Sequence, residues 1–491
     1  MTKGPFIHRF RTDNGRYIYD VNSNHVLGVD PVVYEVVKRW GTTTDDKISE
    51  ALCHKFSQEE IRRAIAEIVS FSETGFFQDF RPTALRYHKP FAAIRRDLNT
   101  RLEQVVLSIT EACNLRCGYC VYSGRYLHKR SHSSRNMPWS IARKAVDYLL
   151  SHSQDRKKIA VGFYGGEPLL RFGLIRKTVQ YLKRTAGEKR VRFNLTTTGT
   201  LITDAIIDFL AENDMDVLIS LDGPKDVNDR YRRFRNGQGS YDRITKNLEK
   251  ILTRNEDYYR RRISFNMIMA PPYRPLKIES FIRNHAHLFQ NARITTGGVD
   301  AQGTTFFDPF SPGDRSDREF RILEKRMLAD VARGCKTNTR LLGITMKDSI
   351  LLKIYKRDIG RQMTHYEYPN GVCTPGLRRF FVSVDGTFHM CEKISETMAI
   401  GDIETGLDPD RIISLMKTYA EKSTPDCCKC WALRLCTLCY IHAYCADFDL
   451  ETKRMNCESA KKIIHRGLQL YCRILEKNPD ALAPMKHIAL S

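Results

Sequence analysis

Six short apolar runs, each separated from the next by a longer segment with polar and helical character, constrain the fold of this 491-residue chain most. The runs cover residues 105–109, 159–164, 191–196, 216–221, 263–269 and 292–296. Apolar strands that alternate with helices are typical of a parallel sheet buried on both faces, and right-handed crossovers would close such a sheet into a barrel or part of one. We therefore expect an α/β fold.

Three cysteines lie on one short stretch directly after the first apolar run. Cys113, Cys117 and Cys120 have the spacing C-x3-C-x2-C. Three thiolates can hold three irons of a four-iron, four-sulfur cluster and leave the fourth iron open for a small chelating ligand. An open iron indicates chemistry rather than a structural role. The alternative is a zinc site, because zinc is often bound by C-x2-C pairs.

Motifs after the later runs resemble those of the radical SAM superfamily, in which the open iron binds the amino and carboxylate groups of S-adenosylmethionine (SAM). Residues 164–168 resemble the family's GGE motif, and residues 220–224 precede 228–232 at the spacing that the family uses. Residues 194–200 resemble its third-strand motif, with Thr198 where the family usually has Asn. Each motif ends a predicted strand, which is where parallel α/β folds build their sites.

This resemblance implies a partial (β/α)6 barrel over residues 100–310, one SAM-binding 4Fe-4S cluster on the three cysteines, and SAM itself. The glycines of the GGE motif would let the backbone approach the methionine amino group, and Ser220 and Arg232 would bind the carboxylate. The SAM-binding residues that the resemblance implies are Tyr119, Gly165, Gly166, Glu167, Ser220 and Arg232.

A second group of cysteines lies near the C-terminus and resembles the SPASM domain, a radical SAM appendage with two auxiliary iron-sulfur clusters. By this resemblance one cluster is held by Cys427, Cys430, Cys436 and Cys457, and the other by Cys373, Cys391 and Cys439. The second set lacks an obvious fourth thiol. Either Cys428 or Cys335 completes it, or its fourth iron is open and could bind a substrate thiolate. A four-cysteine zinc knuckle is the alternative for this region.

The chain holds 15 cysteines, and most of them fall in metal-ligand spacings, which argues against a disulfide framework and for a reducing, cytoplasmic setting. Cys53, Cys445 and Cys472 are expected to be ordinary buried thiols. No apolar run approaches the roughly 20 residues that a membrane span needs, so we expect a soluble protein with no membrane partner.

The formal net charge of +22 predicts attraction to anionic partners. Arginine and lysine gather at residues 125–135, 230–235 and 260–262, between the expected barrel elements. We find none of the usual nucleic-acid-binding motifs. An acidic peptide is therefore the preferred partner over nucleic acid, RNA modification remains an alternative, and a solvated surface is the simplest explanation of the charge.

Residues 1–85 predict a separate small domain. Three short strands are expected at residues 6–10, 16–20 and 25–29, and Ser57 with Glu60 forms a capping box that opens a later helix. Three strands followed by helices resemble the winged-helix peptide-recognition domain of ribosomal-peptide maturases, which captures a leader peptide by strand addition. A docking or dimerisation module is the alternative.

The likeness covers nearly the whole chain, with residues 311–369 as a helical linker and 370–475 as the SPASM domain. It implies a radical SAM/SPASM maturase of a ribosomally made precursor peptide, of the thioether (ranthipeptide) or sactipeptide type. Such an enzyme would form crosslinks, foremost Cys thioethers, through a 5′-deoxyadenosyl radical. It would contain three 4Fe-4S clusters and take electrons from a donor such as flavodoxin or ferredoxin.

Three other functions remain open. An anaerobic sulfatase-maturating enzyme, which makes formylglycine, also carries a SPASM domain and has Cys-Asp after its hairpin, the Asp serving as base. This chain has Cys391-Glu392 there, which makes Glu392 the candidate catalytic base. A carbon-carbon crosslinking peptide cyclase is the second, and a non-enzymatic iron-sulfur or zinc scaffold is the third.

Overall fold

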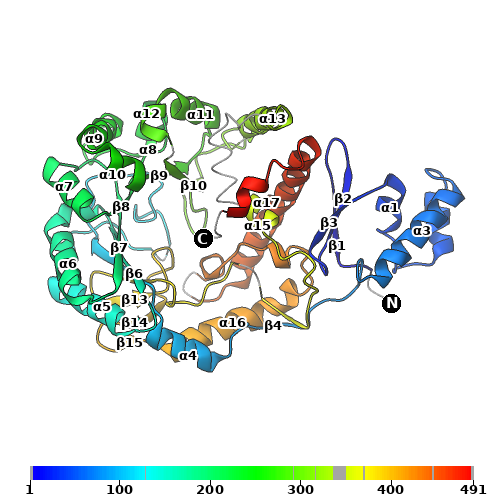
Figure 1. Ribbon diagram of the computed structural model, residues 1–491, viewed down its shortest axis with the longest axis horizontal. Coiled ribbons are helices and arrows are strands. Elements are labelled where there is room, and N and C mark those ends of the chain that lie inside the picture. Colours follow the sequence, from blue (N-terminus) through cyan, green and yellow to red (C-terminus); the bar gives the residue numbers. More distant parts are fainter. Residues whose placement is uncertain are drawn as a thin grey trace.

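A mostly parallel sheet forms the centre of the molecule. The computed structural model describes residues 4–127, 129–290, 292–315, 317–334, 350–368, 371–444 and 447–487. Six adjacent parallel strands correspond to the six apolar runs: β5 (Gln104–Thr110), β6 (Lys158–Gly165), β7 (Arg190–Thr197), β8 (Asp216–Ser220), β9 (Ile263–Met269) and β10 (Arg293–Gly298). They follow one another in sequence order across a curved sheet (Figure 1). The predicted α/β fold is confirmed.

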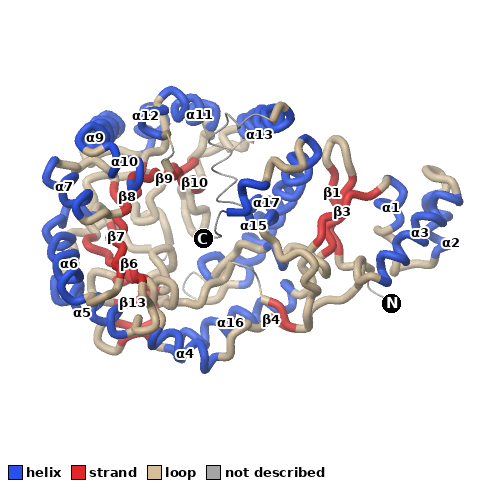
Figure 2. Tube along the Cα trace, viewed as in Figure 1, coloured by secondary structure: helices blue, strands red, loops and turns tan. Residues whose placement is uncertain are grey.

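Helices between these strands cover the outer, convex side of the curve (Figure 2). They are α5 (Trp139–Ser151), η1 (Pro168–Arg171), α6 (Phe172–Thr185), α7 (Asp204–Glu212), α8 (Lys225–Tyr231), α9 (Tyr241–Arg254), α10 (Glu256–Arg262), α11 (Pro275–Asn284) and α12 (Ala286–Phe289). In α9, for example, Ile244, Leu248 and Ile251 lie on one buried face. This spacing fits the helical repeat, so the outer face of the sheet is closed by apolar contacts.

The same sheet continues into the C-terminal region. β12 (Phe380–Val382) pairs in parallel with β5, and β13 (Thr387–His389), β14 (Ala399–Asp402) and β15 (Gly406–Leu407) follow in antiparallel order. The turn between β12 and β13 contains Gly386 with φ +92°, a left-handed conformation that glycine adopts without strain. The cysteine-rich region is thereby fixed directly to the strand that precedes Cys113.

The N-terminal residues form a compact unit with its own apolar core. Its antiparallel sheet runs β1 (Ile7–Arg11), β2 (Arg16–Asp20), β3 (His25–Val29), and its helices are α1 (Pro31–Val36), α2 (Asp45–Leu52) and α3 (Gln58–Glu73). The capping box of Ser57 and Glu60 opens α3, as the sequence indicates. Three strands followed by three helices are therefore present.

This unit lies against α17 (Leu450–Lys477), the long C-terminal helix (Figure 1). The imidazole of His8 stacks on the indole of Trp431 at 3.5 Å between ring centroids. Its Nε2 lies 2.9 Å from Nδ1 of His465. Burial, together with the nearby His465, lowers the pKa of His8 to about 3, so the ring is neutral near pH 7. Tyr17 donates a hydrogen bond of 2.7 Å to Glu476 on the same helix.

The remaining elements join these parts. They are β4 (Ala84–Leu85), α4 (Phe91–Thr100), α13 (Arg318–Ala332), α15 (Ile350–Tyr355), β11 (Tyr366–Glu367), α16 (Pro409–Cys427), η2 (Leu433–Leu435), η3 (Tyr440–His442) and η4 (Ala483–His487). α13 and α15 belong to the predicted helical linker, whose middle part, with Cys335, lies outside the described residues, as does Cys445. Among the helices that the structure describes, none has the length and apolar character to cross a bilayer.

Two of the remaining cysteine predictions have different outcomes. Cys472 is buried, as expected. The prediction that Cys53 is buried is wrong, because its side chain is exposed just after α2. The apolar face of that helix is formed by Ile48 and Leu52, and Cys53 follows it at the C-cap, where it turns toward solvent.

Acidic neighbours neutralise many of the clustered arginines. Arg261 contacts Asp214 and Asp257, and Arg262 contacts Asp214 at one side and Asp216, 3.0 Å away, at the other. The arginines at residues 260–262 thus hold the end of α10 to the start of β8. Their positive charge is largely balanced by carboxylates of the same chain.

Candidate functional site

The loop that carries Cys113, Cys117 and Cys120 starts where β5 ends and lies against the segment after α8. The backbone N–H of Arg116 donates to the carbonyl of Arg233 at 2.7 Å, and that of Gly118 to the carbonyl of Tyr231 at 3.2 Å. The three thiols interact electrostatically with one another, and burial raises the pKa of Cys113 to about 11 and that of Cys117 to about 12. Thiols in such surroundings stay neutral unless a metal ion or cation binds them.

Two of the predicted SAM-binding residues meet beside this loop. Nη1 of Arg232 donates to the hydroxyl of Tyr119 at 3.0 Å, and that hydroxyl donates in turn to the carboxylate of Asp222. All three side chains are buried. Nε of Arg232 is buried without a hydrogen-bond partner among the described atoms. An unsatisfied guanidinium N–H beside Cys117 fits an anionic ligand such as the SAM carboxylate.

Asp222 was not predicted as a site residue, although it lies within the motif at residues 220–224. Burial raises the pKa of its carboxyl group, and the positive charge of Arg232 opposes this shift. The backbone N–H of Ile268 donates to its Oδ1 at 3.0 Å. Asp222, just after β8, and Arg232, at the C-terminal end of α8, are linked through the hydroxyl of Tyr119. The sequence places both residues but does not show that they meet.

The glycines of the GGE motif allow two backbone segments to touch. A Cβ atom on Gly165 would lie 2.2 Å from the carbonyl oxygen of Thr110, and one on Gly166 would lie 2.1 Å from that of Ala112. The N–H of Gly166 donates to Thr110 at 2.7 Å, and the N–H of Glu167 donates to Ala112 at 2.9 Å. The motif is therefore hydrogen-bonded to the residues that immediately precede Cys113.

The carboxylate of Glu167 is buried and fully engaged by the protein. It accepts hydrogen bonds from the hydroxyl of Thr197 at 2.7 Å, from the backbone N–H of Thr198 at 2.7 Å and from that of Leu169 at 3.0 Å. Glu167 thus ties the end of β6 to the end of β7. Ser220 lies half-buried at the end of the next strand, β8.

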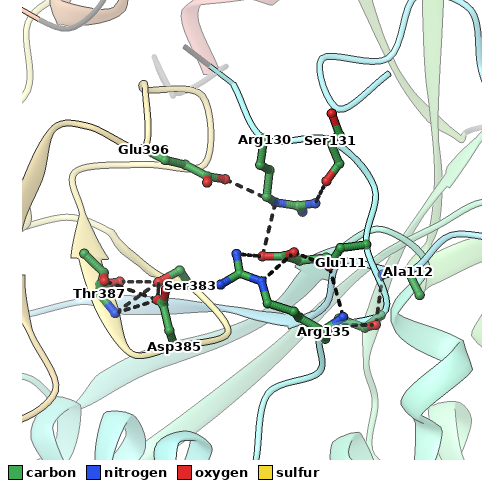
Figure 3. A network of polar contacts seen from close by, with 11 residues as sticks. Glu111, Ala112, Arg130, Ser131, Arg135, Ser383, Asp385, Thr387 and Glu396 are labelled. Carbon is green, nitrogen blue, oxygen red and sulfur yellow. Dashed lines mark hydrogen bonds and ion pairs between the residues drawn. The ribbon is translucent and has the colours of Figure 1, made fainter. Parts of the chain in front are cut away.

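A polar network joins the cysteine loop to the C-terminal strands (Figure 3). Buried Glu111 accepts hydrogen bonds from Arg135, the nearer at 2.5 Å, and its carboxylate lies 3.9 Å from Nε of Arg130. Arg130 also contacts Glu396 at 3.1 Å, and Arg135 contacts Asp385 at 3.5 Å. The loop after the three cysteines is held between β5 and the β12–β14 region. No single motif indicated this connection.

The C-terminal cysteines fall into two sets. Cys439 interacts electrostatically with Cys373 and Cys391. We call these three residues the set of three. Nδ1 of His442 accepts a hydrogen bond from the backbone N–H of Cys439 at 3.1 Å and lies 3.8 Å from its sulfur. Glu392, the predicted base, lies next to Cys391 and accepts hydrogen bonds of 3.0 and 3.2 Å from Arg379.

The other C-terminal set contains four cysteines, Cys427, Cys430, Cys436 and Cys457, which we call the quartet. Cys430 and Cys436 each interact with Cys427, and Cys436 also interacts with Cys457. Burial raises the pKa of Cys430 to about 12 and that of Cys436 to about 11. These interactions place the four thiols near one another, and their assignment to one cluster stays a prediction. Cys428, the candidate fourth ligand of the set of three, interacts electrostatically with Cys427 of the quartet.

The donor chemistry of the quartet fits a metal cluster. Nζ of Lys453 lies 3.3 Å from the sulfur of Cys427 and 3.9 Å from that of Cys457, and Lys453 is only 2% exposed. A buried ammonium requires a negative partner, and thiolates bound to iron supply one. Within the described ranges, no three His, Cys, Asp or Glu side chains are arranged to share a single metal ion.

Comparisons with known proteins agree with this geometry. The uncharacterized protein MJ0907 of Methanocaldococcus jannaschii is 34% identical over 139 residues, which are 28% of this chain and 45% of that protein. A cysteine-type anaerobic sulfatase-maturating enzyme of Clostridium novyi is 31% identical over 160 residues, 32% of this chain and 42% of that enzyme. The chain thus spans less than half the length of these curated relatives.

A solved structure shows a similar fold. The structure described as native anSMEcpe with bound AdoMet and Cp18Cys peptide superposes with a TM-score of 0.54 at 19% identity, over 79% of this chain and 99% of that one. Residues 107–280, which run from β5 into α11 and contain the three-cysteine loop, match the sequence pattern of the radical SAM superfamily. This chain therefore contains a radical SAM domain.

Proposed function

We propose that this protein is a radical SAM maturase that crosslinks a ribosomally made precursor peptide, foremost through Cys thioether bonds. The single observation that carries the proposal is the combination, in one molecule, of a radical SAM domain, two further cysteine sets and an N-terminal sheet with a strand at its edge. When bound, a four-iron cluster and SAM supply one-electron chemistry that removes a hydrogen atom from a substrate carbon.

The residues around the first cluster would bind and orient SAM. Arg232, with its unsatisfied Nε, would hold the carboxylate together with Ser220, and Tyr119 would keep the guanidinium in place. Gly165 and Gly166 would present backbone groups to the amino group. Glu167 would act on SAM through the position of this backbone, because its own oxygens already accept hydrogen bonds from the protein.

The N-terminal unit would bind the leader part of the substrate. β1 faces α17, whereas within the described residues β3 has β2 as its only partner strand. A strand edge offers backbone N–H and C=O groups to an extended peptide. The docking of this unit on α17 would keep a bound leader at a fixed distance from the cysteine sets.

The set of three, Cys373, Cys391 and Cys439, would hold an auxiliary cluster with room for one more ligand. We propose that this ligand is the substrate thiolate, and that Glu392 is the base that accepts its proton. The proton would pass to a carboxylate that Arg379 already holds in place. A donor such as flavodoxin or ferredoxin in the cytoplasm would supply the electron that starts the reaction, and the cysteine sets would hold the clusters that take up the electron released on ring closure.

The second candidate function is maturation of a sulfatase. It is favoured by the sulfatase-maturating relative, whereas Glu392 stands where that family has Asp. In that case Glu392 would deprotonate a substrate Cys or Ser on the way to formylglycine. A carbon-carbon crosslink is a further outcome of the same site chemistry.

The test is anaerobic co-expression of the full chain with a short cysteine-containing precursor encoded beside its gene, followed by mass spectrometry with thiol alkylation. Loss of a pair of hydrogens for each alkylatable cysteine that disappears is the expected result. The same mass loss with every thiol still free would show a carbon-carbon crosslink. An unmodified peptide, together with conversion of a sulfatase peptide to formylglycine, would replace the proposal by the second candidate.

The matched control is a precursor that lacks its leader. We expect the core peptide alone to be modified poorly and modification to recover when the leader is supplied as a separate peptide. Equal modification with and without the leader would remove the proposed role of the N-terminal unit while leaving the crosslinking reaction intact.

A further inference from the structure

Lys453 is an unusual residue beside the quartet. It lies near the N-terminus of α17, is 2% exposed and places Nζ within 3.3 Å of the sulfur of Cys427 and 3.9 Å of that of Cys457. Its ammonium also lies 5.7 Å from the centroid of the Tyr419 ring. A lysine is almost never fully buried unless it is paired. The structure therefore contains a built position for a positive charge.

Two features of this position make the positive charge of Lys453 costly unless negative groups offset it. Water is excluded, and the first turns of a helix carry partial positive charge that repels a cation. Asp426 interacts electrostatically with Lys453, but Arg454 already binds its two oxygens at 2.7 and 3.3 Å. The sulfurs of Cys427 and Cys457 accept hydrogen bonds from its ammonium, so thiolates bound to a cluster would offset this charge.

The C-terminal end of α16 also contributes to the electrostatic environment of Lys453. Cys427 is the last residue of that helix, where the partial charge of the backbone is negative and favours a cation. Lys453 thus joins the start of α17 to the end of α16 through the sulfur of Cys427, and it also contacts the sulfur of Cys457 on α17 itself. Its contact with the quartet is made by the fold and not by a flexible surface side chain.

We propose that Lys453 is a positioning residue that raises the reduction potential of a four-iron cluster held by the quartet. The proposal rests on the proposed assignment of a cluster to these four thiols. One-electron reduction adds a negative charge to the cluster without making or breaking a bond or moving a proton. A fixed ammonium that donates to two ligand sulfurs stabilises the reduced form more than the oxidised form, because it faces one more negative charge.

The set of three has a different environment. A carboxylate, Glu392, directly follows Cys391 and interacts with it electrostatically. A negative neighbour opposes reduction, whereas Arg378 and Arg379 act on Cys373, and Lys393 on Cys439, in the opposite sense. The set of three therefore has charges of both signs beside its thiols.

The test is a dithionite titration of the iron-loaded full chain, followed by electron paramagnetic resonance. The quartet signal is identified as the one that disappears in a Cys430→Ala variant. For Lys453→Met we expect the equilibrium constant for one-electron reduction to fall at least about tenfold, which corresponds to ~59 mV. Lys453→Arg keeps the charge and should retain a potential near that of the wild-type protein.

The matched control is Lys429→Met, because Lys429 is exposed and lies next to the same cysteines in sequence. It should leave the potential unchanged. An unchanged potential in Lys453→Met, with full iron content, would overturn the proposal. Loss of the quartet signal in Lys453→Met but not in Lys453→Arg would support a need for the charge. Loss of the quartet signal in both variants would overturn the proposal and show that the size and shape of the lysine side chain matter rather than its charge.

Failure of the underlying function would look different. If the wild-type protein gave no quartet signal and its iron content matched fewer clusters, the cluster assignment itself would be wrong. The lysine variants are informative only when the wild-type signal is present, so the two failures are separated by one spectrum of the unmodified protein.

Discussion

At the scale of single residues, Arg232 and Asp222 are two oppositely charged groups that Tyr119 links within the radical SAM domain. Both are buried, and the hydroxyl of Tyr119 lies between them, accepting from the guanidinium and donating to the carboxylate. A buried pair of this kind contributes little net stability, but removal of one partner leaves the other uncompensated. The contact therefore has a pH dependence that can be measured.

Replacement of Arg232 by Met should destabilise the protein more at high pH than at low pH. Burial already raises the pKa of Asp222, and removal of Arg232 raises it further. A carboxyl group whose folded pKa exceeds its unfolded pKa stabilises the fold when protonated, and this contribution is lost as pH rises through the folded pKa. The Tm deficit relative to the wild-type protein should therefore grow as the pH rises above the usual range of an aspartate carboxyl group.

The double variant Arg232→Met with Asp222→Asn is the control for this prediction. It removes the carboxyl group that titrates, so its Tm deficit should be nearly constant with pH and smaller at the upper end. A deficit for the single variant that shrinks as pH rises would contradict the assignment of Asp222 as the uncompensated group.

Single residues could be predicted from the sequence where a motif contains them, and not where a contact joins distant segments. The cysteines, Tyr119 and Arg232 were candidates because they belong to motifs. Lys453 was not, because nothing in a local window shows that a lysine of α17 reaches Cys427 at the end of α16. This contact becomes visible only when the two helices pack.

At the scale of elements, the main feature of the site is the close contact between the residues at the end of β6 and those at the end of β5. Gly166 permits it, since any Cβ there would overlap the carbonyl of Ala112, which is backbone and cannot turn away. We expect Gly166→Ala to cost ~1–3 kcal/mol of stability and to displace the residues before Cys113. Thermal unfolding and iron content report the two effects.

Gly173→Ala in α6 is the matched control, because no atom lies within 4 Å of the position that its Cβ would occupy. It should leave iron content unchanged and keep Tm the same or slightly higher, as alanine favours helix. Equal loss of iron in the two variants would contradict the role given to the close approach at Gly166.

Elements were predicted well where the pattern is local. The six parallel strands match the six apolar runs within one or two residues, and the capping box of α3 is present. The extension of the same sheet by β12–β15 was not predicted. Pairing of Phe380 with Val105 joins residues far apart in sequence, and the period of a strand does not specify its neighbour.

At the scale of the whole molecule, side-chain contacts join the N-terminal unit to α17. Glu476 of α17 accepts hydrogen bonds from Thr12 at 2.5 Å and Tyr17 at 2.7 Å. We expect Glu476→Ala to increase amide hydrogen exchange in β1 and β2 without loss of iron, because the contacts lie away from the cysteine sets. Glu451→Ala, exposed on the same helix, should leave exchange unchanged.

Exchange in β1 and β2 that stayed at the wild-type level in Glu476→Ala would contradict this prediction and show that the stacked His8 and Trp431 are sufficient to hold the unit.

The sequence indicated the N-terminal unit itself. Its placement on α17 could not be predicted, because it depends on side chains more than 400 positions apart, such as His8 and His465.

The central claim is that three sets of cysteines each bind an iron-sulfur cluster. Anaerobic reconstitution followed by iron, sulfide and zinc analysis of the wild-type protein tests it most directly. We predict about twelve irons per chain, at four per cluster, and about eight after replacement of Cys113, Cys117 and Cys120 by Ala. A wild-type protein with no more than about four irons and with zinc in the remaining thiol sets would contradict the claim.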